Sequence, residues 1–388
     1  MSTKRRHRGA NEGSIYQRTD GRWECKISLG YRNGKRYRPS IYGETRAEVA
    51  TLLNKALRDH NLGLPVAPER QKVATFLDRW LKESVRPSVR PLTYEQYAQH
   101  VRLYLVPAFG HLDLGKLVAD HVQAFINRQL QKGLSPRTVQ LSLATLKRAL
   151  KQAERWALIP RNVALLVDAP RVRTPERQPL DPEQSKALLA AAVGERHEAL
   201  FALLLFGGFR EGEALGLEWK NIDFARRTIA VEQSLARIGR GSDEGSKLVP
   251  QEPKTPQSRR VVQMPDVVFK YLREQRRRQA EQRLAMGPEW REQGLVFTTQ
   301  KGTPLEASNV YRAFKSLLLR AGLPNVRVHD LRHSTASLLL NLGVELKTIQ
   351  TILGHSSIRI TSDLYAHLAP KMKRDAADHL DKLFESEN

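Results

Sequence analysis

Cysteine is almost absent from this sequence of 388 residues, in which Cys25 stands alone. A single cysteine excludes an intrachain disulfide and a cysteine-rich zinc site, and it fits a reducing cytoplasm. Cys25 falls at an apolar position of an expected strand, so we interpret it as a small core side chain. Also missing are a run of about 18 apolar residues, a signal-peptide pattern and a lipidation motif, so the sequence indicates no membrane partner.

Acidic residues are outnumbered, because 64 Lys and Arg stand against 41 Asp and Glu. The formal net charge is +23 and the isoelectric point is about 10.3. This excess indicates a polyanionic partner. Nucleic acid is the leading candidate, since cations that neutralise phosphates release condensed counterions. The length suggests two or three domains, and a hydrophobic content of 40% is sufficient for packed cores.

The first 62 residues are predicted to form a basic arm and a small module of three strands and a helix. Asp20-Gly21 and Asn33-Gly34 are turn pairs that favour hairpins. They predict an antiparallel meander over about 14–18, 22–30 and 35–42. Thr45 and Glu48 then form a capping box that starts a helix.

This module is also locally basic, since residues 1–60 carry 14 Lys and Arg against 6 Asp and Glu. A basic face of the sheet could enter a groove of DNA or follow its phosphates; a solvated face is the alternative. The candidate DNA contacts here are Arg22, Lys35, Arg36 and Arg38.

Helical periodicity dominates the next part of the chain. After a linker over 63–71, residues 72–167 are predicted to form a helical bundle, in which Ser135 caps a helix whose first residue is Pro136. A basic linker with several prolines follows over 168–179. Candidate DNA contacts in the bundle and this linker are Arg137, Lys147, Arg148, Arg171 and Arg173.

Residues 180–370 are predicted to form a mostly helical domain with a small β-sheet near 227–264, followed by a tail over 371–388. The predicted fold class is therefore multidomain and mainly α, with α+β parts. Four local patterns stand out in the third domain. They are Gly207-Gly208-Phe209-Arg210-Glu211-Gly212-Glu213, Pro253 to Arg260 around Lys254, His329-Asp330-Leu331-Arg332-His333, and Leu353-Gly354-His355 with Tyr365 ten residues later.

These patterns, in this order, resemble the catalytic domain of tyrosine recombinases of the phage integrase family. The bundle resembles the core-binding domain of that family, and the first module resembles the arm-binding domain of larger integrases. One departure is Gly207-Gly208-Phe209-Arg210, where many relatives have Thr-Gly-Leu-Arg. The resemblance implies an enzyme that cuts and rejoins DNA through a 3′-phosphotyrosyl link, integrating or excising a mobile element.

The chemistry of phosphodiester cleavage fits these residue types. A tyrosine is a weak nucleophile at neutral pH, because its pKa is about 10, and nearby cations stabilise the phenolate. Arginines bind the non-bridging oxygens with a fork that lysine cannot reproduce. The resemblance assigns the nucleophile to Tyr365, the phosphate contacts to Arg210 and Arg332, and the general acid to Lys254, in an expected hairpin turn. It assigns further proton and phosphate contacts to His329 and His355. Glu213, three residues after Arg210, is expected to orient that arginine, and His333 is a further supporting candidate.

Other interpretations remain open for individual residues. Arg210 alone could be a helix-end cation paired with Glu213, and His329 with His333 could bind a metal ion. A non-catalytic DNA-binding regulator of the same fold, a type IB topoisomerase and a metal-dependent nuclease are the alternative functions. We predict no cofactor, because the sequence has no P-loop and no clear carboxylate cluster for two metals.

The resemblance also implies a set of partners. It implies double-stranded DNA attachment sites of core and arm type, and a homotetramer on DNA in which residues 371–388 pack on a neighbouring protomer. Docking of this tail onto its own domain is the alternative. It is compatible with a directionality factor and a host DNA-bending protein. The implied location is the cytoplasm of a prokaryotic cell, on the nucleoid when bound.

Overall fold

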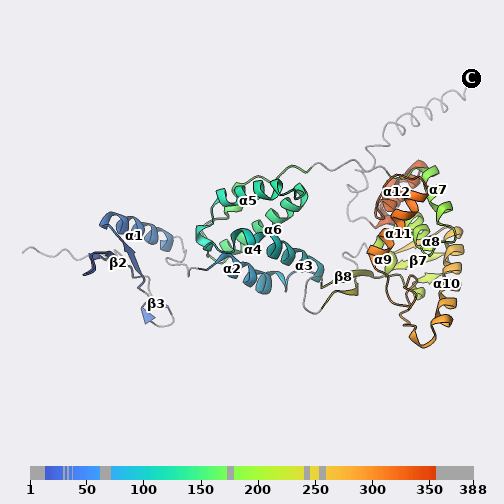
Figure 1. Cartoon of the computed structure of the whole chain (residues 1–388), viewed down its shortest axis with the longest axis horizontal. Coiled ribbons are helices and arrows are strands. Elements are labelled where there is room, and N and C mark those ends of the chain that lie inside the picture. The colour runs from blue at the N-terminus through green and yellow to red at the C-terminus, as the bar shows by residue number, and fades with distance from the viewer. Residues whose placement is uncertain are drawn as a thin grey trace, which may run out of the picture. The chain divides into compact units, whose positions relative to one another are not determined.

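The computed structural model describes residues 14–28, 31–32, 35–36, 38–61, 71–172, 179–239, 245–252 and 259–354 (Figure 1). The chain divides into two compact units, Met1–Thr174 and Pro175–Asn388. Several sequence-based predictions fall outside the described residues. They are the basic arm, Arg173, Lys254, His355, Tyr365 and the tail over 371–388.

The N-terminal module (residues 14–61) is a three-stranded antiparallel sheet with one helix. Strands β1 (Ser14–Gln17), β2 (Trp23–Lys26) and β5 (Ser40–Gly43) lie in the order β1-β2-β5, which confirms the meander. Helix α1 (Arg46–Asn61) covers one face, where Cys25, Ile27 and Val49 are buried together. The interpretation of Cys25 as a core side chain is thereby confirmed.

Two details of this module differ from the prediction. The third strand of the sheet begins at Ser40, because β3 (Tyr31–Arg32) and β4 (Lys35–Arg36) form a separate two-stranded ladder before it. The Thr45 hydroxyl accepts from the Glu48 N–H at 3.2 Å, but the Glu48 carboxylate accepts from Glu44 N–H rather than closing the capping box on Thr45. The helix start is nevertheless where the sequence predicts it.

Residues 72–167 form the helical bundle, which has its own hydrophobic core around Phe76, Trp80 and Leu146. The Ser135 hydroxyl accepts from the Thr138 N–H at 3.1 Å and Pro136 is the first helical residue, so the predicted cap is confirmed. The elements are α2 (Val73–Trp80), η1 (Leu81–Val85), α3 (Pro91–His100), η2 (Val101–Leu105), α4 (Val106–Phe109), η3 (Leu114–Lys116), α5 (Ala119–Gln131), α6 (Pro136–Arg155) and η4 (Val163–Leu166).

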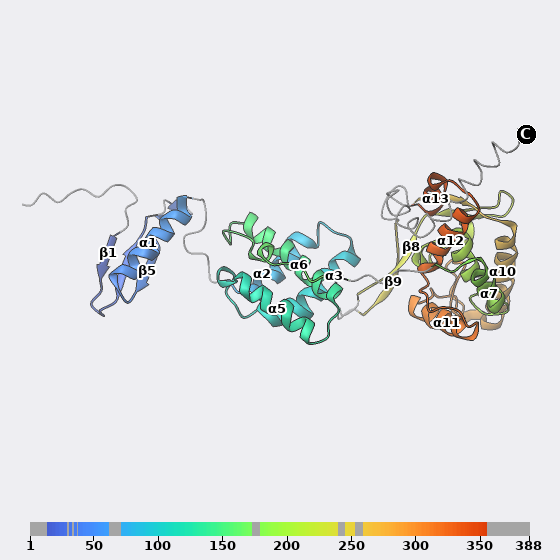
Figure 2. The same cartoon turned by 90° about the horizontal axis from the view of Figure 1, so that it is seen from above.

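The second unit is built around α8 (Glu198–Gly207), whose residues are nearly all apolar and buried. Helices α7 (Pro182–Ala192), α10 (Asp266–Met286) and α12 (Asp330–Asn341) contact it (Figures 1 and 2). A helix that is apolar on all sides must be enclosed by other elements. The remaining helices are α9 (Glu211–Leu215), η5 (Trp219–Asn221), η7 (Gly287–Glu289), α11 (Ala307–Arg320) and α13 (Leu346–Leu353).

The described part of this unit also contains two small sheets. Strands β6 (Ile222–Asp223), β7 (Thr228–Val231) and β10 (Arg260–Gln263) form one sheet, in the order β10-β7-β6. Strands β8 (Ser234–Ile238) and β9 (Lys247–Gln251) form a separate antiparallel pair. The strands that flank residues 253–258, β9 and β10, therefore belong to different sheets. Lys254 itself lies outside the described residues, so its expected place in a hairpin turn stays a prediction.

The architecture confirms the predicted fold class, mainly helical with small antiparallel sheets. None of the described helices is long and apolar enough to span a membrane.

Candidate active site

Arg210 is placed by a sharp turn at the end of α8. Gly208 adopts a left-handed conformation (φ 58°), which ends the helix and redirects the chain into α9. A Cβ atom at Gly208 would lie 2.3 Å from Leu353 Cδ2, so only glycine permits this approach to α13. Arg210 then occupies the N-cap position of α9 with extended backbone.

Glu213, one turn into α9, binds Arg210 twice. Its Oε1 accepts from the Arg210 guanidinium at 2.5 Å, and its Oε2 accepts from the Arg210 backbone N–H at 3.0 Å. The pairing expected of a helix-end cation is therefore present. The pairing with Arg210 is not the whole arrangement, because the buried Glu213 carboxylate also binds a second arginine, Arg260.

Arg332 comes from the first turn of α12 and is 3% exposed. Its guanidinium donates to the Gly208 carbonyl at 2.6 Å and to the Leu353 carbonyl at 2.5 Å. Burial, followed by the positive charges of Arg210 and Arg260, lowers the pKa of Arg332 to about 9, while Glu213 acts in the opposite direction. A cation in such a place is stabilised by an anion at short range.

Arg260 is the site residue that sequence reasoning missed. It is the first residue of β10, and its side chain is 6% exposed and donates to Glu213 Oε2 at 3.0 Å. Its Nε donates to the Ile352 carbonyl at 2.8 Å, and its guanidinium lies 5.5 Å from the centre of the Phe209 ring. The available signal was the period-two pattern, which places Arg260 on the same side of the strand as buried Val262.

Two guanidiniums, those of Arg210 and Arg260, therefore bind one carboxylate, and the charge of that carboxylate also acts on the buried Arg332 guanidinium. Burial alone would raise the pKa of the Glu213 carboxyl, but the Arg260 and Arg210 guanidiniums hold that pKa below its usual value. Arg210 also donates to the Gly354 carbonyl at 3.2 Å. The cluster lies at the end of α13 and combines three positive charges with the one negative charge of Glu213. This excess of positive charge is suited to an oxyanion such as a phosphate.

The two histidines of the third pattern lie next to this cluster in sequence. His329 precedes α12 and His333 follows Arg332, and their ring centres are 5.5 Å apart in an edge-to-face arrangement. Within the part of the chain that the structure describes, no three His, Cys, Asp or Glu side chains group as metal ligands.

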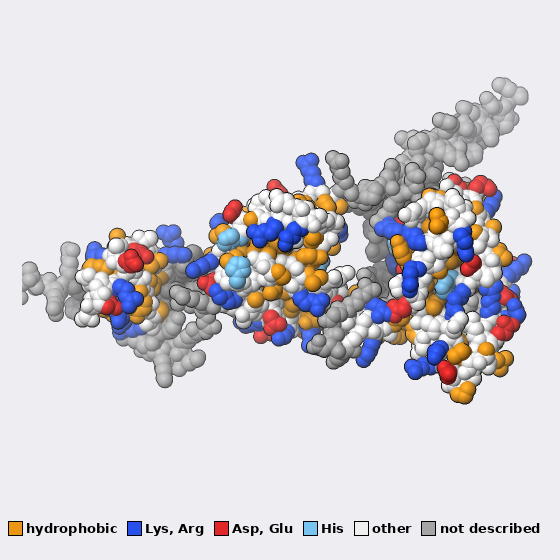
Figure 3. Space-filling view, in the orientation of Figure 1, with side chains coloured by type: hydrophobic (Ala, Val, Ile, Leu, Met, Phe, Trp, Pro, Cys, Tyr) orange, Lys and Arg blue, Asp and Glu red, His pale blue; other side chains and the backbone are white. Residues whose placement is uncertain are grey.

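The candidate DNA contacts of the bundle differ from one another in their surroundings. Arg137 and Arg148 are exposed on α6, and the Arg148 guanidinium also donates to the Tyr97 hydroxyl at 2.7 Å. Lys147 is half-buried and donates to the Val167 carbonyl at 3.2 Å, which fastens the chain after η4 to α6. Arg171 is exposed. Figure 3 shows Lys and Arg side chains spread over the visible faces, with acidic side chains among them.

The solvent face of the N-terminal sheet has an acidic centre. Tyr16, Glu24 and Tyr42 lie side by side in register on the three strands. Hydrogen bonding from Ser40, opposed by burial and supported by Tyr16, lowers the pKa of Glu24 to about 2. Arg22 and Arg38 are exposed, whereas Lys35 and Arg36 are described only by their backbone in the β3–β4 ladder. The face is thus polar and mixed in charge rather than uniformly basic.

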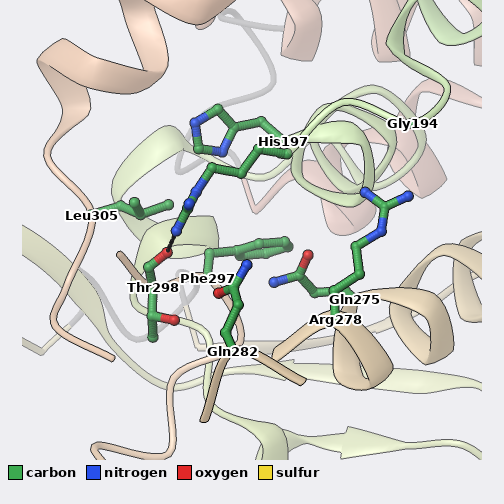
Figure 4. Close-up of a pocket in the computed structure, with 9 residues that line it drawn as sticks. Gly194, His197, Gln275, Arg278, Gln282, Phe297, Thr298 and Leu305 are labelled. Atoms are coloured by element: carbon green, nitrogen blue, oxygen red, sulfur yellow. Dashed lines mark hydrogen bonds between the residues drawn. The ribbon is translucent and has the colours of Figure 1, made fainter. Parts of the chain in front are cut away.

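A polar cavity of about 250 Å³ lies at the other end of α8 (Figure 4). Arg196 donates to the Thr298 carbonyl at 2.9 Å there, and Arg278 is paired with Glu198 at 3.1 Å. Because α8 has ten residues, this cavity is separated from the arginine cluster by about 15 Å of helix.

Comparison with known proteins assigns the family. The model of the phage integrase family matches residues 178–372, and the model of the phage integrase N-terminal SAM-like domain matches residues 72–130. A tyrosine recombinase XerC-like protein of Caldanaerobacter subterraneus subsp. tengcongensis is 32% identical, covering 91% of this chain and 93% of that protein. The chain belongs to the phage integrase family. It is a tyrosine recombinase, an enzyme of site-specific recombination, and this supports the enzyme rather than the non-catalytic regulator.

Other relatives extend over nearly the whole integrase. An integrase of Streptomyces ambofaciens is 31% identical and covers 98% of each chain. Among solved structures, the Tn1549 transposon integrase in complex with transposon right end DNA has the same fold, with a TM-score of 0.66, 24% identity and coverage of 79% of this chain and 100% of that one. A lambda integrase tetramer bound to a Holliday junction gives a TM-score of 0.56 at 17% identity, covering 92% and 96%.

Proposed function

We propose that this integrase cleaves DNA by attack of Tyr365 on a phosphodiester that is held by Arg210 and Arg332. The observation that supports this most directly is the cluster of the Arg210, Arg260 and Arg332 guanidiniums, of which the first two bind the carboxylate of Glu213. An excess of positive charge in a largely buried place favours a bound anion, and the bidentate fork of arginine fits the oxygens of a phosphate.

The reaction is balanced without an external energy source. The Tyr365 oxygen bonds to phosphorus after its proton passes to a neighbouring base, a role that the family resemblance gives to His329. The bond from phosphorus to the 5′ oxygen breaks, and the leaving 5′ oxygen takes a proton from Lys254. His355 donates to the phosphate. The 3′-phosphotyrosyl link keeps the energy of the broken bond, so a 5′ hydroxyl of a partner strand can reverse the step.

The other parts supply DNA binding in this proposal. The bundle and the linker after it contact the core sites, and the N-terminal module contacts arm-type sites through Arg22, Arg38 and their neighbours. The lambda integrase tetramer on a Holliday junction supports a homotetramer here, with residues 371–388 packing on a neighbouring protomer. A directionality factor and a host DNA-bending protein would set the direction of recombination. The single buried cysteine and the bacterial relatives support action in a prokaryotic cytoplasm.

The test is covalent trapping on suicide DNA. A nicked attachment-site substrate, which loses a short 5′ fragment after cleavage, is incubated with the protein and run on an SDS gel. The wild type should give an SDS-resistant complex, which Tyr365→Phe should abolish. Arg332→Lys should reduce its rate by roughly 10² to 10³, the usual loss for a stabilising donor in a transition state.

The outcomes separate the possible functions. A complex that persists in Tyr365→Phe would contradict the proposed nucleophile. Tight specific binding without any complex would contradict cleavage and favour a regulator. Cleavage that stops when a chelator is added would favour a metal-dependent nuclease.

A further inference from the structure

Arg260 is a buried cation in a strand that is otherwise built for packing. Its neighbour Val261 is largely exposed, whereas Arg260 and Val262 face inward. Burying a charge is costly unless it is paired and hydrogen-bonded. The inward position of Arg260 therefore needs partners strong enough to offset its desolvation.

Its partners join two elements that are distant in sequence. The carboxylate of Glu213 comes from α9, and the carbonyl of Ile352 comes from the last turn of α13. Phe209, just before Arg210, covers one face of the guanidinium at 5.5 Å from the ring centre. Arg260 thus fixes the first turn of α9 against the end of α13.

The end of α13 is held by three arginines in succession. The carbonyls of Ile352, Leu353 and Gly354 accept from Arg260, Arg332 and Arg210, at 2.8, 2.5 and 3.2 Å. Carbonyls in the last turn of a helix have no partner within the helix and carry its negative dipole end. They are therefore natural acceptors for the cluster. The next residue in sequence is His355.

The three arginines differ in exposure, which separates their roles. Arg210 has a side chain that is 38% exposed, while Arg260 and Arg332 are almost fully buried. The Arg260 guanidinium donates to Oε2 of Glu213, whereas the Arg210 guanidinium donates to Oε1 through one terminal nitrogen. Without Arg260, both carboxylate oxygens of Glu213 would be available to the Arg210 guanidinium. Such a bidentate pair would occupy the two nitrogens of Arg210 that are needed to bind a phosphate.

We propose that Arg260 is a positioning residue for recombination: it limits the hold of Glu213 on Arg210 and fixes the end of α13 from which His355 follows. Arg260 does not touch the phosphate in this scheme and acts through Glu213. The proposal rests on the proposed function for its kinetic test, because Arg210 is assigned there to the phosphate.

The experiment measures three quantities on suicide DNA for Arg260→Gln, Arg260→Lys and the neighbouring control Arg259→Gln. They are DNA affinity, the amplitude of covalent complex and its single-turnover rate constant. Arg259 is exposed and pairs only loosely with Glu252, at 3.4 Å. Arg260→Gln should keep affinity within about twofold and lower the rate constant roughly 10- to 100-fold, as misplaced supporting groups do. Arg260→Lys should recover part of the rate, and Arg259→Gln should match the wild type.

A purely structural role predicts something different: a smaller amplitude, because less protein is folded, with an unchanged rate constant in the folded fraction. That result would overturn the proposal, as would an equal loss in Arg259→Gln. Action through Glu213 also predicts that Arg260→Gln adds little to Glu213→Gln, whereas multiplied losses would contradict it. If the wild type forms no covalent complex, the proposed function fails. The coupling of Arg260 with Glu213 is then measured by the same double-mutant cycle in urea unfolding without DNA. Strictly additive changes in the free energy of unfolding would overturn the inference.

Discussion

Arg210 owes its position to its neighbours in the turn between α8 and α9. Gly207 and Gly208 let the chain leave α8 beside Thr335 and Leu353, and Glu213 then holds the guanidinium. The departure from the common family pattern at 207–209 has a steric explanation. A Cβ atom at Gly207 would lie 2.3 Å from Phe209 Cε2, so the glycine and the phenylalanine require each other.

This pairing gives a prediction for stability. Gly207→Ala alone should lower the free energy of unfolding by about 1 to 3 kcal/mol, because the added methyl group overlaps the Phe209 ring. The double variant with Phe209→Leu should be no less stable than Phe209→Leu alone. Urea unfolding of the four proteins measures the coupling, and additive losses would show that the two positions are independent.

At the level of single residues, the sequence located Arg210, Glu213 and Arg332 because each belongs to a compact local pattern. It missed Arg260 because its role depends on partners 47 and 92 positions away in the chain. Spacing along a strand shows that the side chain faces inward, but it does not show which groups lie there.

Helix α6 illustrates what an element adds to its residues. Arg137, Leu141, Ala144, Arg148 and Lys151 recur every three or four positions and are all exposed, so they form one stripe. Lys147 lies at the edge of this stripe and is tied to the Val167 carbonyl. The element therefore separates basic residues that are open to DNA from one that supports the bundle.

We predict opposite effects for these two groups. Replacing Arg137 and Lys151 by glutamine should weaken DNA binding and leave the free energy of unfolding within about 0.5 kcal/mol of wild type. Lys147→Gln should cost about 1 kcal/mol of stability, because it removes the hydrogen bond to the Val167 carbonyl, with a smaller effect on affinity. Anisotropy titrations and urea unfolding distinguish them; a weaker affinity confined to Lys147→Gln would reverse the assignment.

Elements with local signals were predicted well, as the capped start of α6 and the first two strands show. The third strand of the N-terminal sheet was placed too early, because β3 and β4 form a separate ladder before it. Strand patterns also do not reveal which strands pair: β9 pairs with β8, and β10 pairs with β7.

On the scale of the whole molecule, the net charge of +23 is distributed over parts with separate cores. Affinity for DNA should therefore fall steeply as the salt concentration rises, and each of these parts should contribute to the slope of that dependence. We predict that Arg22→Gln with Arg38→Gln lowers the slope of log affinity against log salt, on arm-type DNA only. The decrease should be about 0.9 for each phosphate that the variant no longer neutralises.

The control for this prediction is Lys55→Gln with Arg58→Gln, which removes the same charge from exposed positions of α1. Helix α1 covers one face of the sheet, so the opposite face is the one left open for a groove. Equal changes in slope for both pairs would indicate a general charge effect instead of a binding surface.

The most direct measurement is mass spectrometry of the trapped covalent complex, digested with nuclease and protease. The chain has ten tyrosines, so the modified peptide identifies the nucleophile without relying on loss of activity. We predict a single nucleotide-linked peptide that contains Tyr365, with the phosphate attached through its 3′ position. A nucleotide on another tyrosine, or on any other residue type, would contradict the proposed active site.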